Sequence, residues 1–214
     1  MIIDTNRRTT PQLACLREAG TTGVIRYYAR ATSQPEKRLV REEAQAILAA
    51  GMSVGVVHEA AGNAPSAFSS TIGEADATYA FAYAARTIGQ PAGSAIYFAV
   101  DYDCSDDDVT NAIIPHFRAI AAVAASGATP RYAIGAYGNG LVLRRLLAEK
   151  LVAYAWLSQS TGFREYQSFL DSGAWVLRQG PARTLCSIGV DGNDANPKAA
   201  GWGAFTTLDP LPAP

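Results

Sequence analysis

The chain has 214 residues, of which 49% are hydrophobic and 17% charged, and its formal net charge at pH 7 is −1. This composition supplies enough apolar side chains for a full core and argues against intrinsic disorder. We expect neither nucleic acid nor a membrane as a partner, because the chain has no basic cluster and no apolar stretch as long as a membrane helix. The N-terminal MIIDTN lacks the profile of a signal peptide.

Short apolar segments alternate with helical patterns along the whole chain. Thr10 and Pro11 predict the start of a first helix, which Gly20 ends, and Pro115 must kink or split a later one. Strands are expected over residues 1–5, 23–28, 53–59, 95–100, 131–137, 153–159, 174–179 and 187–191.

Eight strands that alternate with helices favour a single (β/α)8 barrel of the TIM type over an open sheet, because no glycine-rich phosphate-binding turn is present. The final helix is short or missing, so the barrel is expected to be irregular. We assign residues 1–207 to this domain and residues 208–214 to a Pro-rich tail.

The chain has one run of acidic residues, at positions 106–108, directly after Ser105. A serine followed by acids is typical of a helix N-terminus, where the hydroxyl caps backbone N–H groups and the carboxylates complement the helix dipole. We favour this interpretation over a metal site, and we expect the protein to need no metal or other cofactor.

Three cysteines, Cys15, Cys104 and Cys186, show no CxxC spacing and cannot all pair. We therefore expect a reduced environment during folding and no structural zinc. Cys104 lies beside Asp103 and Asp106, which would raise the pKa of its thiol, so a packing role is favoured over a nucleophilic one.

Acidic residues follow several of the expected strands. Asp101 and Asp103 end the fourth strand, and residues two apart in an extended chain point the same way with α-carbons roughly 6.5 Å apart. A pair of carboxyl groups at about that separation is the basic requirement for splitting a glycosidic bond. Asp4, Glu59 and Asp191 end the first, third and eighth strands, so a barrel would bring all five acids to one rim, where such barrels hold their active sites.

Amide, aromatic and basic side chains at the same strand ends are candidates for binding sugar hydroxyls and ring faces. The second strand ends at Tyr27 and Tyr28, of which we assign Tyr28 to substrate binding. The full set of substrate-binding candidates is Arg26, Tyr28, Tyr137, Trp156, Gln159, Gln179 and Asp191.

Other hydrolase signatures are missing from the sequence. His58 precedes Glu59 and is expected to point away from a site that Glu59 faces. With His58 and His116 as the only histidines and no HExxH motif, a zinc hydrolase is not expected. A GxSxG nucleophile elbow is likewise not found.

Several motifs together resemble a known bacterial family. They are IIDTN, GVIRYY, VVHE, IYFAVDYD, IGAYGNG, AYAWLSQS and VDGND, spread over roughly residues 1–207. The sequence is similar to a bacterial glycoside-hydrolase-like domain long catalogued as domain of unknown function 1906. That family looks like a distant relative of the family 25 muramidases, lysozymes with an irregular (β/α) barrel that cleave peptidoglycan.

The resemblance implies that Asp4, Glu59, Asp101, Asp103 and Asp191 line an active cleft. The muramidases carry Asp-x-Glu after the fourth strand, with the glutamate as general acid, whereas this chain has Asp103, one methylene shorter, at that position. Three alternatives follow: Asp103 still reaches the glycosidic oxygen, Glu59 supplies the proton, or the domain binds glycan without cutting it.

From these patterns we expect a monomeric glycosidase that acts on bacterial cell-wall glycan or another N-acetylated polysaccharide, with Asp4, Glu59, Asp101 and Asp103 as the catalytic residues. The two other hypotheses are an inactive glycan-binding domain and a metal-dependent phosphodiesterase barrel. Without a signal peptide, the protein would reach the wall through a pore or a secretion machine, or as a phage lysin released at lysis.

Overall fold

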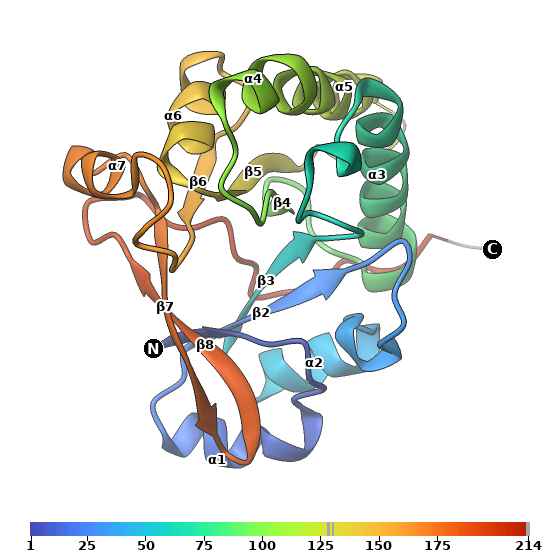
Figure 1. Ribbon diagram of the computed structural model, residues 1–214. Coiled ribbons are helices and arrows are strands. Elements are labelled where there is room, and N and C mark those ends of the chain that lie inside the picture. The colour runs from blue at the N-terminus through green and yellow to red at the C-terminus, as the bar shows by residue number, and fades with distance from the viewer. Residues whose placement is uncertain (128, 130, 213–214) are drawn as a thin grey trace.

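A closed eight-stranded barrel forms the centre of the protein in a computed structural model that describes residues 1–127, 129 and 131–212 (Figure 1). The strands follow one another around the barrel in chain order. They are β1 (Ile2–Asp4), β2 (Gly23–Tyr28), β3 (Ser53–His58), β4 (Ala95–Ala99), β5 (Ala133–Gly138), β6 (Tyr154–Leu157), β7 (Leu177–Leu185) and β8 (Ile188–Ala195).

Helices cover the outside of the barrel, on the side away from its axis (Figure 1). They are α1 (Leu13–Glu18), α2 (Arg41–Ala49), α3 (Ser70–Tyr83), α4 (Asp106–Asp108), α5 (Ile114–Ala125), α6 (Gly140–Ala148) and α7 (Tyr166–Ser172). As predicted, Ser105 caps α4: its hydroxyl accepts from the Asp108 backbone N–H, and the Asp108 carboxylate accepts from the Ser105 backbone N–H. Pro115 lies in the first turn of α5, directly after a π-helical segment, Val109–Ile113, that separates α5 from α4. The helical region is thus split next to Pro115, as the sequence predicts.

The eighth strand departs from a regular (β/α)8 barrel. Strands β1 to β7 pair in parallel with their neighbours, but β8 pairs antiparallel with both β7 and β1. Leu185 pairs with Ile188, so Cys186 and Ser187 alone form the turn, with φ of 51° and 67°. Positive φ at both residues suits a two-residue hairpin turn, and a connection this short cannot join parallel strands. The expected irregularity therefore includes a reversed strand, which was not predicted.

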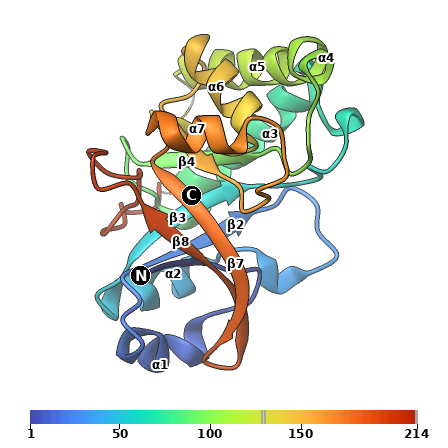
Figure 2. The ribbon, with the colours of Figure 1, turned by 60° about the vertical axis from the view of Figure 1, so that its left-hand side comes forward.

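The β7–β8 hairpin extends beyond the barrel toward α1 (Figure 2). There Cys186 forms a disulfide with Cys15, whose α-carbon is 5.9 Å from that of Cys186. The expectation of a reduced folding environment is therefore wrong, because disulfides form and persist in oxidising compartments. Cys104 is free and buried, and burial raises the pKa of its thiol to about 12, in agreement with a packing role.

Hydrophobic side chains form two cores on the two sides of the barrel wall. The larger one, the outer core, lies between the strands and the surrounding helices. The smaller one, the inner core, fills the barrel interior and consists of Ile2, Ile25, Val57, Ala95, Tyr97, Trp156 and Leu177. Since side chains alternate across a strand, neighbouring residues of one strand belong to opposite cores. This alternation decides which residues of a strand face the barrel interior and which face the helices.

The segment after β8 forms no helix in the part of the chain that is described, as expected for a missing last helix. Phe205 instead pairs with Val54 of β3, and Leu208 packs against the outer core. The Asp209 backbone N–H donates to the Gly89 carbonyl at 2.7 Å, so the first residues of the Pro-rich tail are attached to the connection between α3 and β4. Among the described residues, we find no helix that has both the length and the apolar character to cross a membrane.

Replacing both disulfide cysteines with serine should destabilise the fold without unfolding the barrel core. The bond closes a loop with a sequence separation of 171 residues, and a cross-link of this kind contributes about 2–5 kcal/mol. For a chain of this size, that loss corresponds to a melting temperature lower by roughly 5–20 °C. Thermal unfolding followed by circular dichroism, with and without reductant, measures the effect. Reductant should lower the wild-type melting temperature and leave that of the double variant unchanged; a wild type indifferent to reductant would contradict the pairing.

Candidate active site

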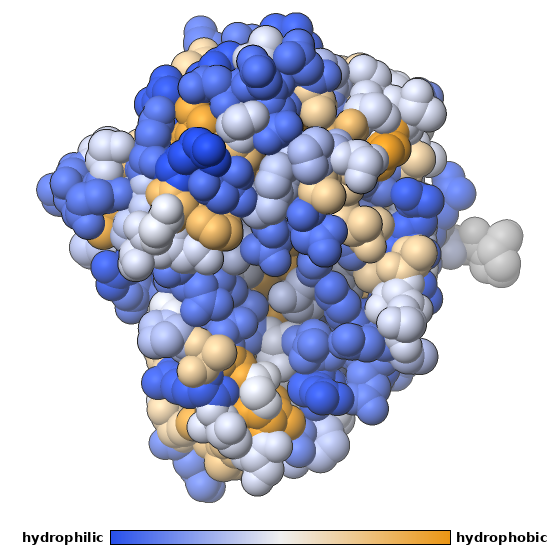
Figure 3. All heavy atoms as spheres, in the orientation of Figure 1, coloured by the Kyte–Doolittle hydropathy of each residue, from blue (hydrophilic) through white to orange (hydrophobic). Residues whose placement is uncertain are grey.

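Two adjoining cavities lie at the carboxyl ends of the barrel strands. The aromatic cavity, of about 320 Å³, is lined by Val57, Ala99, Tyr137, Trp156, Gln159, Ser160 and Gln179. The loop cavity, of about 680 Å³, is lined by residues 4–7, Lys37 and the β7–β8 hairpin residues 182–184 and 189–190. Four residues line both, namely Tyr27, Glu59, Asp101 and Asp191. Hydrophilic side chains dominate the molecular face seen in Figure 3, which has only small, scattered hydrophobic patches.

Asp4 is the most deeply buried acid of the site, with 1% of its surface exposed. Its Oδ2 accepts hydrogen bonds from the Gln179 side-chain amide at 3.0 Å and from the Asn193 amide at 2.8 Å. Both amides are oriented by a second donor: the Tyr137 hydroxyl donates to Gln179 Oε1, and the Trp156 indole N–H donates to Asn193 Oδ1, each at 2.8 Å. The N–H groups of both amides are thereby directed at Asp4.

Burial raises the pKa of Asp4 to about 7, and the negative charge of Asp191 adds to the rise. The hydrogen bonds from Asn193 and Gln179 oppose it but do not compensate for the lost hydration. Asp4 is therefore partly protonated near neutral pH.

Two further acids have raised pKa values. Burial is the main cause for Asp101, followed by repulsion from Glu59, while a hydrogen bond from Tyr137 opposes the shift. The pKa of Asp191 is raised by burial and by the charge of Asp101. Several carboxyl groups in one concave site cannot all ionise at low cost, so at least one of them holds its proton near neutrality.

Glu59 has a cationic partner that the sequence analysis missed. The Lys37 ammonium donates to Glu59 Oε2 at 2.6 Å and lies 4.5 Å from the centroid of the Tyr27 ring. Lys37 belongs to a short 3-10 helix, Pro35–Lys37, in the connection after β2. No motif or periodicity marks a lysine in such a connection, so its place beside the acids became visible only in three dimensions.

Asp103 lies outside both cavities, so its predicted position in the cleft is corrected. Its Oδ1 accepts from the Arg164 backbone N–H at 2.7 Å and from the Asn139 amide at 3.1 Å, and its Oδ2 accepts from the Arg164 guanidinium at 2.7 Å. The reason is local geometry, because β4 ends at Ala99 and the chain bends at Tyr102. The strand alternation that would align Asp101 with Asp103 therefore does not extend to them.

Arg26 and Tyr28 also lie away from the cavities, which corrects their assignment to substrate binding. Both face the outer core, where Arg26 pairs with Glu43 and the Tyr28 hydroxyl donates to Gln90 at 2.9 Å. Tyr27, between them, faces the site. Alternation along β2 requires this outcome, since residues 26 and 28 share one face and residue 27 the other.

The other candidates lie where the strand ends predicted. Asp4, Glu59, Asp101 and Asp191 line the cavities, as do Tyr137, Trp156, Gln159 and Gln179. His58 points away from Glu59, as expected, and its imidazole lies 3.2 Å from the Asp76 carboxylate of α3. Within the described residues, no group of three or more His, Cys, Asp or Glu side chains is arranged to hold a metal ion.

A closed α/β barrel with acids clustered at its strand ends is an arrangement found in glycoside hydrolase-like barrels. Residues 14–194 match the family described as "Rv2525c-like, glycoside hydrolase-like domain", and the chain belongs to this family. The family resemblance inferred from the sequence motifs is thus confirmed.

Three proteins illustrate the relationship. The uncharacterized protein YbfG of Bacillus subtilis is 35% identical over 158 residues, which are 70% of this chain and 21% of YbfG, so the chain spans about a fifth of that relative's length. The Tat-secreted protein Rv2525c of Mycobacterium tuberculosis, solved with L-tartrate, matches with a TM-score of 0.79 at 20% identity over 95% of this chain and 97% of Rv2525c. The modular autolysin LytC of Streptococcus pneumoniae, solved with a synthetic peptidoglycan ligand, matches with a TM-score of 0.58 at 14% identity over 90% of this chain and 45% of LytC. At these identities, the two structural matches show a shared fold.

Asp4→Asn should change how the stability of the protein depends on pH. The folded pKa of about 7 lies above the ordinary value of 3.8, so the folded state binds the proton more tightly and the wild type loses stability as pH rises from about 4 to 7. The loss attributable to Asp4 is on the order of 4 kcal/mol. Asparagine has the shape of the protonated acid and does not titrate. Urea unfolding between pH 4.5 and 8 should therefore show the variant gaining stability relative to the wild type as pH rises. Parallel curves for the two proteins would contradict a raised pKa at Asp4.

Proposed function

We propose that this domain is a glycoside hydrolase that acts on bacterial cell-wall glycan, with peptidoglycan as its substrate class. The observation that carries the proposal is the convergence of Asp4, Glu59, Asp101 and Asp191 on two cavities that also present amide groups and aromatic rings. Carboxyl groups supply the chemistry of glycosidases, and amides and flat rings suit sugar hydroxyls and sugar faces. The peptidoglycan ligand of the structurally similar LytC supports this substrate class.

Glycoside cleavage needs one carboxyl group that carries a proton and one that is charged. We assign the proton donor to Asp101, which lines both cavities and whose pKa is raised by burial and by Glu59. The Asp101 proton passes to the glycosidic oxygen, and the bond to the anomeric carbon breaks with its electron pair leaving on that oxygen. The carboxylates of Glu59 and Asp191 stabilise the positive charge that develops on the sugar. Water then adds to the anomeric carbon and returns a proton to Asp101.

A glycan-binding domain without hydrolytic activity is the second candidate function. The placement of Asp103 favours it, because the resemblance to the muramidases puts the general acid at this position. Here the Asp103 carboxylate is held by Arg164 and Asn139 and lines neither cavity. The cavities would still offer rings, amides and acids to a bound sugar.

The proposal extends to the setting in which the protein works. We propose an irregular TIM-type barrel that is exported to the cell wall as a monomer. The Cys15–Cys186 disulfide supports an oxidising compartment, and the similar Rv2525c is a Tat-secreted protein. Among the described residues, the large hydrophobic side chains that are exposed are Met1 and Leu211, which do not form the kind of apolar surface a stable dimer buries.

The Asp101→Asn variant tests the proposed proton donor, with Asp103→Asn as a matched control two residues away. Removing the donor proton should lower kcat by about 10²-fold or more while glycan affinity survives. Asp103→Asn should lower kcat by less than about 10-fold, since it weakens only a loop contact. Release of reducing ends and of soluble fragments from purified peptidoglycan measures activity, and a pull-down on insoluble peptidoglycan measures binding.

Three results would decide among the candidates. A larger loss for Asp103→Asn than for Asp101→Asn would return the proton donor to the position implied by the muramidase resemblance. Wild-type protein that binds peptidoglycan but releases no fragments would support the glycan-binding domain. Wild-type protein that neither binds nor cleaves peptidoglycan would reject the proposed substrate class.

A further inference from the structure

Lys37 is placed at the edge of the acidic cluster by a connection rather than by a strand. It lines the loop cavity together with Glu59, Asp101 and Asp191. Its side chain is 18% exposed and that of Glu59 is 24% exposed, so their ion pair is largely shielded from solvent. The Tyr27 ring lies under the ammonium at 4.5 Å. A cation that contacts both a carboxylate and an aromatic face of the same cavity has little freedom to move.

The backbone that carries Lys37 is fixed by a buried ion pair outside the cavity. Arg26 and Glu43 are both fully buried, and the Arg26 Nε donates to Glu43 Oε1 at 3.0 Å. A second nitrogen of the same guanidinium, Nη2, donates to the Glu36 carbonyl at 2.6 Å, one residue before Lys37. The position of the lysine is therefore set by the guanidinium of Arg26.

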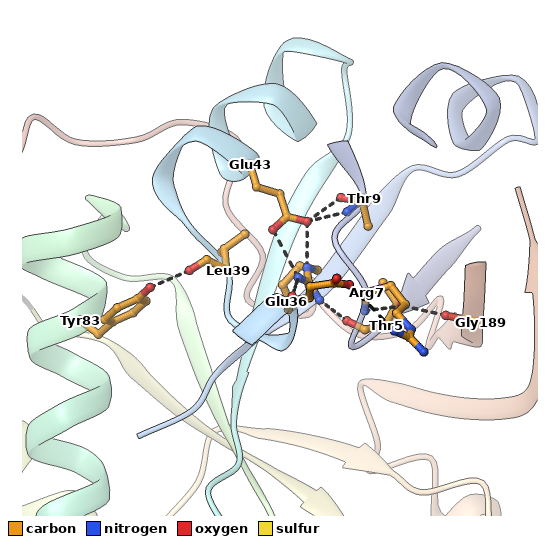
Figure 4. A network of polar contacts seen from close by, with 9 residues as sticks. Thr5, Arg7, Thr9, Glu36, Leu39, Glu43, Tyr83 and Gly189 are labelled. Carbon is orange, nitrogen blue, oxygen red and sulfur yellow. Dashed lines mark hydrogen bonds and ion pairs between the residues drawn. The ribbon is translucent and has the colours of Figure 1, made fainter. Parts of the chain in front are cut away.

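The same ion pair also fixes the connection after β1. Arg26 Nη1 donates to the Thr5 carbonyl, and Glu43 Oε1 accepts from the backbone N–H and the hydroxyl of Thr9, at 2.8 and 2.9 Å (Figure 4). Thr5 in turn donates its hydroxyl to the Gly189 carbonyl of β8 at 2.7 Å. Both connections that border the loop cavity are thus attached to one charged pair, which has the planar, multiple hydrogen bonding that suits arginine.

From this arrangement we propose that Lys37 is a positioning residue of the active site, which acts by holding the Glu59 carboxylate in place, and that the Arg26–Glu43 pair keeps Lys37 there. The inference rests on the proposed function for its effect on catalysis. The geometry of the Lys37 contacts is independent of the proposed function, because these contacts exist without any substrate. The sequence predicted that Arg26 binds substrate. In the structure, Arg26 instead faces the outer core and holds the backbone next to Lys37.

The charges around Asp101 show what Lys37 contributes. The groups that face Asp101 are Glu59 from the end of β3, Lys37 from the connection after β2, Tyr137 from β5 and Asp191 from β8. Lys37 lowers the pKa of Asp101, against the effects of burial and of Glu59. Removing the Lys37 charge should therefore raise the pKa of Asp101, and it should also release Glu59 from its fixed position.

Lys37→Met tests the proposal, with Lys37→Arg as the conservative variant and Lys198→Met as the matched control. Lys198 is exposed and lines neither cavity. NMR titration of the carboxyl carbons should show a higher midpoint for Asp101 in Lys37→Met, a return toward the wild-type midpoint in Lys37→Arg, and no change in Lys198→Met. The kcat of Lys37→Met on peptidoglycan should fall by about 10- to 100-fold through misplacement of Glu59, with KM changed by less than about twofold.

The titration and the kinetics distinguish a failure of the Lys37 proposal from a failure of the proposed function. An Asp101 midpoint that is the same in Lys37→Met and Lys198→Met would overturn the role of Lys37, whatever the activity of the protein. A midpoint that moves as expected in a wild type that cleaves nothing would refute the proposed function and leave the placement of Lys37 supported.

Glu43→Gln tests the buried pair separately, since it removes the charge that holds Arg26 without touching either cavity. It should shift the Asp101 midpoint in the same direction as Lys37→Met, and circular dichroism shows whether the variant folds. A folded Glu43→Gln variant with the wild-type midpoint would overturn the part of the proposal that concerns Arg26 and Glu43. If this variant does not fold, an Arg26→Lys variant, which keeps the charge and loses the bond to the Glu36 carbonyl, takes its place with the same expected result.

Discussion

The antiparallel eighth strand is the constraint on which the candidate site depends. Because β8 runs against β1, Asp191 pairs directly with Asp4 and Asn193 pairs with Ile2. Asp191 and Asn193 of β8 therefore place a second carboxyl group and an amide next to the buried Asp4. Burial is the main cause of the raised pKa of both acids; the charge of Asp191 adds to the rise at Asp4, and the charge of Asp101 adds to the rise at Asp191.

Charge balance in the site is achieved by separating the acids into different surroundings. Glu59 faces a lysine, Asp4 faces two amide donors, and Asp101 lies at the boundary of the two cavities with a tyrosine beside it. Burial raises the pKa of Asp4 and Asp101, whereas Glu59 is paired with a cation, and such differences in surroundings divide acid and base roles on one protein surface. The buried Arg26–Glu43 pair plays a different part, because its charges are compensated within the outer core and its hydrogen bonds are used to hold backbone.

Much of the fold could be predicted from the sequence, because apolar segments and helix signals are local. The strand segments, the cap at Ser105 and the acids at the strand ends all depend on neighbouring residues. The reversed eighth strand could also have been predicted, since only seven residues separate Gln179 from Ser187, too few for a parallel crossover. The disulfide could not, because Cys15 and Cys186 approach each other only through the length and direction of the β7–β8 hairpin.

The errors in the predicted site have two physical causes. Arg26 and Tyr28 were assigned although alternation along β2 allows only one side of the strand to face the cavities, and Tyr27 is on that side. Asp103 was assigned by extending strand alternation past Ala99, where the chain no longer has strand geometry. Lys37 represents the opposite case, because no local signal marks it. Its position is set by a hydrogen bond that the Arg26 side chain of β2 donates to the neighbouring Glu36 carbonyl.

The placement of Asp103 bears on how this family relates to the muramidases. Its carboxylate accepts three hydrogen bonds, two of them from Arg164, so releasing it toward a substrate would leave an arginine and an asparagine without their partner. Lengthening the side chain to glutamate would not by itself free it from these donors. A proton donor at the junction of the cavities requires no such rearrangement, because Asp101 already lines both of them and burial already favours its protonated form. The proposed proton donor is therefore better placed at the first acid of the Asp-Tyr-Asp motif than at the second.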